Sequence, residues 1–223
     1  MNINVILLLC ETLVIFSLLV LVYKYFGKDG LFMWAGLAPV LANIMTVKNA
    51  NILGLNSTCG TVLFASVFLC TDILSEHFGK HESKKAVYIG VVSSIIFVIS
   101  SQICLMYIPS KVDVMAGTLK DLLSLNIRVT FASIICYLGS NLLDVIIYNK
   151  IKLKTNDKYM WIRNNVSTIL CNCLENFAFI FLAYVGIFNI PTIISIASAT
   201  CVIESIVALL DTPFLYIAKR IKQ

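Results

Sequence analysis

The chain has 223 residues, of which 59% are hydrophobic and only 13% are charged. Ordinary soluble domains carry about 25% charged residues, so this composition excludes a soluble globular protein and indicates a polytopic membrane protein. The formal net charge of +5 is less informative than the positions of the charges, because lysine and arginine gather between the apolar segments.

Seven apolar runs follow one another along the chain, separated by short loops. Each approaches or exceeds the roughly 17–25 residues that a transmembrane helix needs. The runs are Ile3–Tyr23, Leu31–Val47, Thr61–Phe78, Ala86–Ile108, Leu125–Tyr148, Val166–Phe188 and Thr192–Ala218. We predict an all-α, polytopic membrane helix bundle with six core transmembrane helices plus one N-terminal helix. The accessory N-terminal helix is expected within residues 1–28 and the six-helix core within residues 29–223.

Basic residues predict the orientation of these helices, because cytoplasmic loops of membrane proteins are enriched in lysine and arginine. Most of the 17 basic residues follow the first, third, fifth and seventh runs. They are Lys24, Lys28, Lys80, Lys84, Lys85, Lys150, Lys152, Lys154, Lys158, Arg163, Lys219, Arg220 and Lys222. The other side holds Lys48, Lys111, Lys120 and Arg128. The N-terminus is therefore predicted outside and the C-terminus in the cytoplasm.

Seven of the twelve acidic residues lie inside the apolar runs, where a carboxylate costs about 2.5–3.5 kcal/mol on insertion scales. They are Glu11, Asp72, Glu76, Asp144, Glu175, Glu204 and Asp211. With the predicted orientation, Glu175 and Glu204 fall near the midplane of the bilayer. No lysine or arginine lies near the middle of any run. Each carboxylate therefore needs a proton, a hydrogen bond or a ligand.

Two groups of polar residues stand out within these runs. Asp72 and Glu76 are four residues apart and share one helix face, which favours a ligand or coupling site, with a structural role at the helix end as the alternative. Asn141 precedes Asp144 by three residues, so these two also share a face. Asn141 and Asp144 form a ligand site or an interhelical hydrogen-bond cluster.

The sixth run carries the pattern Asn172-Cys-Leu-Glu175-Asn176 at mid-depth. The amide at position 172 lies one helical turn from the carboxylate, on the same face. Glu175 is too far from either end of the run for its side chain to reach the interface. A ligand site and an interhelical hydrogen-bond cluster both explain this pattern.

Motifs for nucleotide, metal or covalent chemistry are missing from the sequence. There is no G-x-x-x-x-G-K-[ST], no G-x-S-x-G and no H-E-x-x-H. His77 and His81 have a metal-compatible spacing but lie in a basic turn, so we predict neither a metal site nor a cofactor. The eight cysteines are scattered through apolar runs, which indicates core-filling thiols rather than metal ligands or disulfides.

Two strings are specific when they occur together: D-I-L-S-E-H-F-G-K at residues 72–80 and W-I-R-N-N-V-S-T at residues 161–168. Shorter pieces accompany them, namely Ala42-Asn43-Ile44 with Lys48, Leu143-Asp144, and Asp211-Thr212-Pro213-Phe214 with Tyr216. Over roughly Ala35 to Tyr216 the chain resembles the bacterial queuosine precursor transporter family, integral membrane proteins that import 7-deazaguanines. In that family the positions of Asn172, Glu175 and Asn176 are usually Gln, Asp and Thr, and Lys is common where Glu204 stands.

The resemblance implies a transporter of the bacterial plasma membrane that brings queuine or a 7-deazaguanine precursor into the cytoplasm. Its partners would be a small-molecule nucleobase analogue and the lipid bilayer, without nucleic acid, and a homo-oligomer stays open. No enzymatic chemistry is expected. Arg163 is expected to hold the turn before the sixth run and cap that helix rather than read the base.

A guanine-like edge offers two parallel N–H donors, which an ionised carboxylate accepts and a neutral amide does not match. We therefore expect Glu175 to read the base, and aromatic rings to stack on it. The candidate substrate-binding residues are Glu175, Asn172, Asp72, Asn141, Asp144, Glu204, Asn176, Glu76, Phe68 and Phe177. Three alternatives stay open: the substrate-binding subunit of an energy-coupling vitamin importer, an intramembrane enzyme that uses Asp72 and Glu76 as an acid–base pair, and a membrane scaffold.

Overall fold

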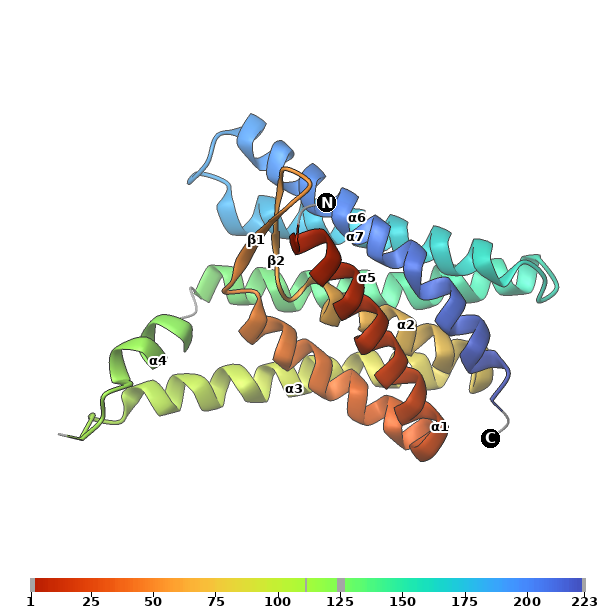
Figure 1. The fold of residues 1–223 in the computed structure, drawn as a ribbon, viewed down its shortest axis with the longest axis horizontal. Helices are drawn as coiled ribbons and strands as arrows, with labels where there is room; N and C mark the ends of the chain where they lie inside the picture. The colour runs from red at the N-terminus through yellow and green to blue at the C-terminus, as the bar shows by residue number, and fades with distance from the viewer. Residues whose placement is uncertain (1–2, 111, 124–126, 222–223) are drawn as a thin grey trace.

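The computed structural model describes residues 3–110, 112–123 and 127–221. Its elements are α1 (Ile3–Met45), β1 (Asn49–Ile52), β2 (Leu55–Thr58), α2 (Thr61–His77), α3 (Lys80–Met106), α4 (Ala116–Leu123), α5 (Ile127–Lys154), α6 (Met160–Tyr184) and α7 (Ile190–Lys219). In this part of the chain, five helices are long and apolar enough to cross a membrane: α1, α3, α5 from Phe131 onward, α6 and α7. The fold is therefore a helical membrane bundle (Figure 1), as predicted, while the count of six core helices plus one stays a prediction.

α1 consists of two helical arms that meet at Gly27. A straight helix of its 43 residues would be about 65 Å long, twice the roughly 30 Å hydrocarbon core of a bilayer. Gly27 has φ 57° and ψ −139°, a conformation that only glycine adopts readily. The chain turns back there, so the two arms form a V (Figure 1). The turn lies beside the predicted boundary at residue 28, although the division into accessory helix and core stays a prediction.

Both arms of α1 pack into the bundle. In the first arm, Phe16 is fully buried and meets Phe214 of α7 edge-on, with the ring centroids 5.5 Å apart. In the second arm, Trp34 donates from Nε1 to the Ser66 hydroxyl of α2 at 2.9 Å. Side chains from both arms belong to the same apolar core as those of α2 and α7.

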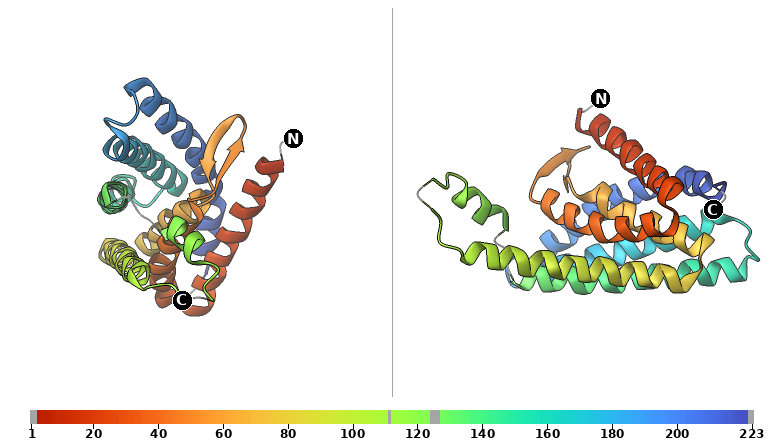
Figure 2. Two further views of the ribbon diagram at one scale, coloured as in Figure 1. Left: turned by 90° about the vertical axis from the view of Figure 1, so that its left-hand side faces the viewer. Right: turned by 90° about the horizontal axis from the view of Figure 1, so that it is seen from below.

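α2 is the most enclosed of the long helices. Its residues from Thr61 to Ser75 are all buried except Phe64, which is half-buried. α1, α3, α5 and α7 all contact it, and it lies in the middle of the molecule when the bundle is viewed from either side (Figure 2). Polar side chains on α2 therefore face protein rather than lipid.

Two elements lie where the apolar pattern predicts only loops. The short helix α4 follows α3, and a β-hairpin joins α1 to α2. In the hairpin, β1 and β2 pair antiparallel with Ile52 opposite Leu55. The turn residues Leu53 and Gly54 both have positive φ, at 55° and 84°, which suits the tight two-residue turn of a hairpin.

A disulfide joins Cys173 of α6 to Cys201 of α7, with the Cα atoms 5.1 Å apart. The prediction that the cysteines are all free thiols is therefore wrong for this pair. α6 and α7 pack against each other over their length, which brings together two cysteines that are 28 residues apart in the chain. Cys70, Cys136 and Cys171 are free and buried, as predicted for core-filling thiols.

Candidate functional site

Polar side chains enter the bundle from α2, α5, α6 and α7 and lie at three successive depths. The depths follow from the helical rise of about 1.5 Å per residue, so that four residues along a helix change the depth by about one turn. We call the three groups the end cluster, the aspartate level and the glutamate level, going from one end of the bundle inward.

The end cluster is centred on Glu76, in the last turn of α2. Its side chain is 3% exposed and its carboxylate contacts three cations. Arg163 lies at 2.7 Å, Lys219 at 2.6 Å and Lys152 at 3.2 Å. Tyr148 donates its hydroxyl to the same carboxylate at 3.2 Å. These five residues connect the ends of α2, α5, α6 and α7.

The aspartate level consists of Asp72, Asp144 and Asp211 with two neutral residues of α6. The three aspartates come from α2, α5 and α7 and are 0% exposed. Asn164 donates from Nδ2 to Asp211 Oδ1 at 2.5 Å. Thr168 Oγ1 lies 3.5 Å from Asp144 Oδ1, which is a long contact. The bundle thus buries three carboxylates from three helices, and in the described structure both oxygens of Asp72 and one oxygen of each of the other two have no hydrogen-bond partner.

Asp72 and Glu76 are one turn apart on α2, but they have different surroundings. Glu76 is neutralised by the basic residues of the end cluster. Within the described part of the chain, neither carboxylate oxygen of Asp72 has a hydrogen-bond partner. Its charged neighbours include Asp144 and Asp211. The structure therefore separates this pair, which the sequence treats as one site, into two environments.

The glutamate level lies further inward, about one turn from the aspartate level on α5 (Asp144 to Ser140) and about two turns from it on α7 (Asp211 to Glu204). Ser140 of α5 donates to Glu175 Oε2 of α6 at 2.5 Å. Asn176 of α6 donates to Glu204 Oε2 of α7 at 2.6 Å. Asn172 is 2% exposed and accepts through its backbone carbonyl from Asn176 at 3.0 Å. Two carboxylates from neighbouring helices are thus each held by one polar side chain.

Asn141 completes the glutamate level on the α5 side. It is 1% exposed and donates from Nδ2 to the Tyr137 carbonyl at 2.9 Å. Its Oδ1 atom has no hydrogen-bond partner in the described structure. The members of the glutamate level are Ser140, Asn141, Asn172, Glu175, Asn176 and Glu204.

The sign of the charge changes with depth in this part of the bundle. The end cluster carries three cations around one carboxylate, whereas the two inner levels carry carboxylates and neutral polar groups. Buried carboxylates need donors or protons, so this arrangement suits a ligand with several N–H groups or with a positive charge. Among the described residues, no three His, Cys, Asp or Glu side chains are placed so that they could hold a metal ion.

The two predicted aromatic residues have different positions. Phe68 is 3% exposed inside α2. Phe177 is 42% exposed on the outer surface of α6, so the structure does not bring it to the glutamate level. The structure adds Ser140, Asn164 and Asp211 as polar neighbours of the predicted residues. The sequence could have pointed to Asp211, because an acid within an apolar run is unusual. Ser140 and Asn164 could not have been found in this way, because single Ser and Asn residues are common in such runs.

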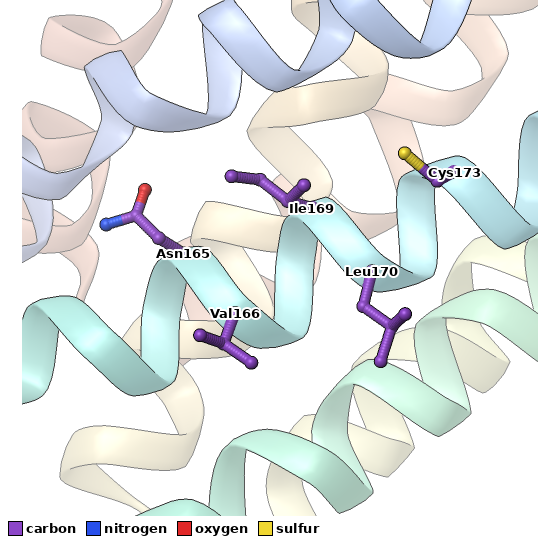
Figure 3. A pocket seen from close by; sticks show the side chains of 5 residues that line it. All are labelled: Asn165, Val166, Ile169, Leu170 and Cys173. Atoms are coloured by element: carbon purple, nitrogen blue, oxygen red, sulfur yellow. The ribbon is translucent and has the colours of Figure 1, made fainter. Parts of the chain in front are cut away.

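Two hollows open on the surface of the bundle, outside the residues of the three levels. One, of about 350 Å³, runs along α6 and is lined mainly by apolar side chains (Figure 3). Its lining residues are Asn165, Val166, Ile169, Leu170 and Cys173. The other, of about 460 Å³, lies between the first arm of α1, the β-hairpin and the start of α2, and includes Glu11 and Lys48. None of the predicted substrate-binding residues lines either hollow.

Residues 58–218 match the family described as "Putative vitamin uptake transporter". A "Probable queuosine precursor transporter" of Bacillus subtilis strain 168 is 33% identical over 206 residues, which cover 92% of this chain and 90% of that protein. The "Queuosine precursor transporter" of Escherichia coli K12 is 26% identical over 145 residues, covering 64% and 62%. A "Probable queuosine precursor transporter" of Haemophilus influenzae is 29% identical over 137 residues, covering 60% and 55%. No solved structure matches the chain.

The family match covers well over half of the chain, and the Bacillus relative is similar along nearly its whole length. The helical membrane bundle agrees with these similarities, because transport across a bilayer requires spanning helices around a polar interior. The chain therefore belongs to the queuosine precursor transporter family, and it is a membrane transporter rather than an enzyme.

Proposed function

We propose that the chain imports a queuosine precursor base, queuine or a 7-deazaguanine precursor, into the cytoplasm. The observation that carries the proposal is the glutamate level, where Glu175 and Glu204 lie inside a membrane bundle and are each held by one polar side chain. The names of three relatives point to the same class of substrate.

Glu175 reads the pyrimidine edge of the base in this proposal. The hydrogen bond from Ser140 occupies Oε2, which fixes the carboxylate and leaves Oε1 and the other lone pairs of Oε2 for the ligand. A guanine-like edge presents two parallel N–H groups, and an ionised carboxylate accepts both. In this proposal the buried amides of Asn141 and Asn172 contact the carbonyl and pyrrole edges.

Glu204 gives the site a second carboxylate at the same depth. An aminomethyl precursor and queuine carry an amine besides the base, and a carboxylate pairs well with such a cation. Asn176 holds Glu204 at 2.6 Å and thereby keeps it at the level of Glu175. The two acids would thus recognise the two ends of one ligand.

The proposed orientation of the bundle is supported by the basic residues. Lys152, Arg163 and Lys219 all lie in the end cluster, and the positive-inside rule favours the cytoplasmic side for such an end. The ion pairs of this cluster close the cytoplasmic end while the site fills from outside. In this arrangement the arm before Gly27 is the additional N-terminal helix and residues 29–223 form the six-helix core.

Uptake of labelled queuine and of labelled 7-aminomethyl-7-deazaguanine tests the proposal in cells that lack synthesis and import of these bases. Expression of the chain should restore accumulation and Glu175→Gln should abolish most of it. Glu11→Gln, the same change in α1 outside the three levels, is the matched control and should accumulate normally. No accumulation with either base, or stable co-purification of ATPase subunits in mild detergent, would contradict the proposal.

A further inference from the structure

Two contacts tie α6 to α7 at separate depths of the bundle. At the aspartate level, Asn164 donates from Nδ2 to Asp211 Oδ1 at 2.5 Å. Further along α6, at a distance of about 13.5 Å by the rise of a helix, Cys173 forms the disulfide with Cys201. Residue numbers rise along α6 as those of their partners on α7 fall, so the two helices are antiparallel. Fixed at two depths, α6 and α7 form one rigid pair.

The disulfide lies beside the hydrogen bond that holds Glu204. Asn176 follows Cys173 by three residues on α6, and Glu204 follows Cys201 by three residues on α7, so each shares a helix face with its cysteine. Because the helices are antiparallel, Asn176 and Glu204 lie on opposite sides of the disulfide along the bundle. Helical side chains lean toward the N-terminus of their own helix, so these two lean toward each other. Asn176 donates to Glu204 Oε2 at 2.6 Å, next to the disulfide.

The disulfide occupies the outer edge of this helix pair. Cys173 lines the hollow that opens on the surface along α6 (Figure 3). Asn176 is 7% exposed and therefore faces protein. The covalent link thus fixes the spacing of α6 and α7 from the outside and leaves their polar inner face free for a ligand.

Glu204 depends on this spacing, whereas Glu175 does not. The backbone of Glu204 belongs to α7 and its hydrogen-bond donor, Asn176, belongs to α6. A separation of the helices by about 1 Å lengthens this contact to about 3.6 Å, at which it is no longer a hydrogen bond. Glu175 is instead held by Ser140 of α5, a contact that does not cross the interface between α6 and α7.

We propose that the Cys173–Cys201 disulfide positions Glu204 and thereby gives the site a preference for bases that carry an amine. The inference rests on the proposed import function, in which Glu175 reads the base and Glu204 pairs with the amine. An aminomethyl group is protonated at neutral pH, as the lysine side chain is, and a carboxylate held in place forms a charge-assisted hydrogen bond with it. A base without the amine gains nothing from the position of Glu204.

The first measurement counts thiols in the purified, denatured protein without reductant, by alkylation and mass spectrometry. Eight cysteines with one disulfide leave six that react, and eight reactive thiols would overturn the inference. Isothermal titration in detergent then compares 7-aminomethyl-7-deazaguanine with 7-methyl-7-deazaguanine, which lacks only the amine. The wild type should bind the first base roughly tenfold more tightly or better, the scale of a hydrogen bond to a charged group.

Cys173→Ala, Cys201→Ala and the double variant should each lower this ratio of affinities roughly fivefold or more. The three values should agree, because each variant removes the same bond. Affinity for the 7-methyl base should stay within about twofold, since Glu175 keeps its place. Cys104→Ala, which changes an exposed free thiol of α3, is the control and should alter neither affinity. An unchanged ratio in the disulfide variants would overturn the inference.

Glu204→Gln connects the disulfide to the carboxylate. This variant should bring the ratio close to one, and Cys173→Ala added to it should lower the ratio no further, because both changes act on one interaction. A further fall of the ratio in the combined variant would overturn the inference. A disulfide that only stabilised the fold would lower the affinities for both bases by the same factor, and that result would overturn it as well.

If the alanine variants do not fold, the purified wild type is reduced with a phosphine until eight thiols react. The reduced protein should show the same fall of the ratio, and an unchanged ratio would overturn the inference. Uptake of both labelled bases by cells that express the wild type is measured alongside. Uptake of neither base would remove the import function and the inference with it. Normal uptake with equal affinities for the two bases would overturn the inference alone.

Discussion

Arg163 of α6 donates from Nη2 to both carboxylate oxygens of Glu76 of α2, at 2.8 and 2.7 Å. Arg163 is 0% exposed and the Glu76 side chain is 3% exposed, so this ion pair is shielded from solvent. Arg163 also lies over the Tyr148 ring, with its Cζ 5.5 Å from the centroid. The contact joins two residues that are 87 positions apart in the sequence, and it brings one residue of each of the two specific strings into the end cluster.

Replacing Arg163 should therefore affect folding more than substrate recognition. Arg163→Ala leaves Glu76 with two lysines and is expected to cost on the order of 3 kcal/mol of folding stability, the lower end for a broken buried pair. Fluorescence size-exclusion should show much less folded protein, while the affinity of the remainder stays within about twofold. Arg220→Ala, an exposed neighbour of the same end, is the control. Normal protein level with clearly weaker binding would mean that Arg163 reads the base.

Ser140 should matter because it orients Glu175. Ser140→Ala removes a hydrogen bond of 2.5 Å to a charged group, which is expected to weaken base binding by about 1–2 kcal/mol, or roughly 5–30-fold. Ser101→Ala removes a buried hydroxyl that bonds only within its own helix, and it should leave binding unchanged. Isothermal titration in detergent measures both variants. Equal affinities for Ser140→Ala and the wild type would remove Ser140 from the site.

Gly27 should tolerate no side chain, because its φ of 57° with ψ of −139° is a conformation reserved almost entirely for glycine. Gly27→Ala is expected to lose about 1–3 kcal/mol of stability through backbone strain. Gly117→Ala, where an added Cβ meets nothing within 4 Å, is the matched change without strain. Thermal unfolding should place Gly27→Ala clearly below both the wild type and this control. An unchanged melting temperature would show that the arms of α1 do not turn back at Gly27.

The termini of this chain should lie on opposite sides of the membrane. The prediction depends on seven crossings, two of them made by the arms of α1, and on the basic residues at the end cluster. A reporter fused after Gln223 should be active in the cytoplasm, and one fused before Met1 should be active outside. Two reporters active on the same side would contradict the seven crossings.

Much of the fold could be predicted because the membrane imposes it. Apolar runs must become helices in lipid, so the segments were recognisable from length and hydropathy alone. The β-hairpin was not, because its turn uses Leu53-Gly54 in place of the Asn-Gly or Asp-Gly pairs that mark such turns. The reversal inside α1 was predicted as a gap between two runs, but its position at Gly27 depends on a backbone angle that the sequence does not show.

The polar residues could be predicted more easily than their partners. A carboxylate in an apolar run stands out by itself, which is why Asp72, Asp144 and Glu175 were identified. The partner of each carboxylate depends on how the helices pack. The sequence therefore could not predict that Glu76 pairs with basic residues while Asp72, one turn away, does not. The same holds for the Cys173–Cys201 disulfide, since facing positions on α6 and α7 follow from the rotation of both helices.

The central claim is that Glu175 reads the base, and ligand-dependent thermal stabilisation of Glu175→Gln tests it most directly. The variant keeps the size of the side chain and removes a buried charge, so it should fold. It should lose about 1.5–3 kcal/mol of binding, or roughly 10–150-fold in affinity. At a fixed concentration of queuine or 7-aminomethyl-7-deazaguanine, the wild type and Glu11→Gln should gain thermal stability, whereas Glu175→Gln should gain little or none. Equal stabilisation of Glu175→Gln and the wild type by either base would show that another carboxylate, Asp72 or Glu204, reads it instead.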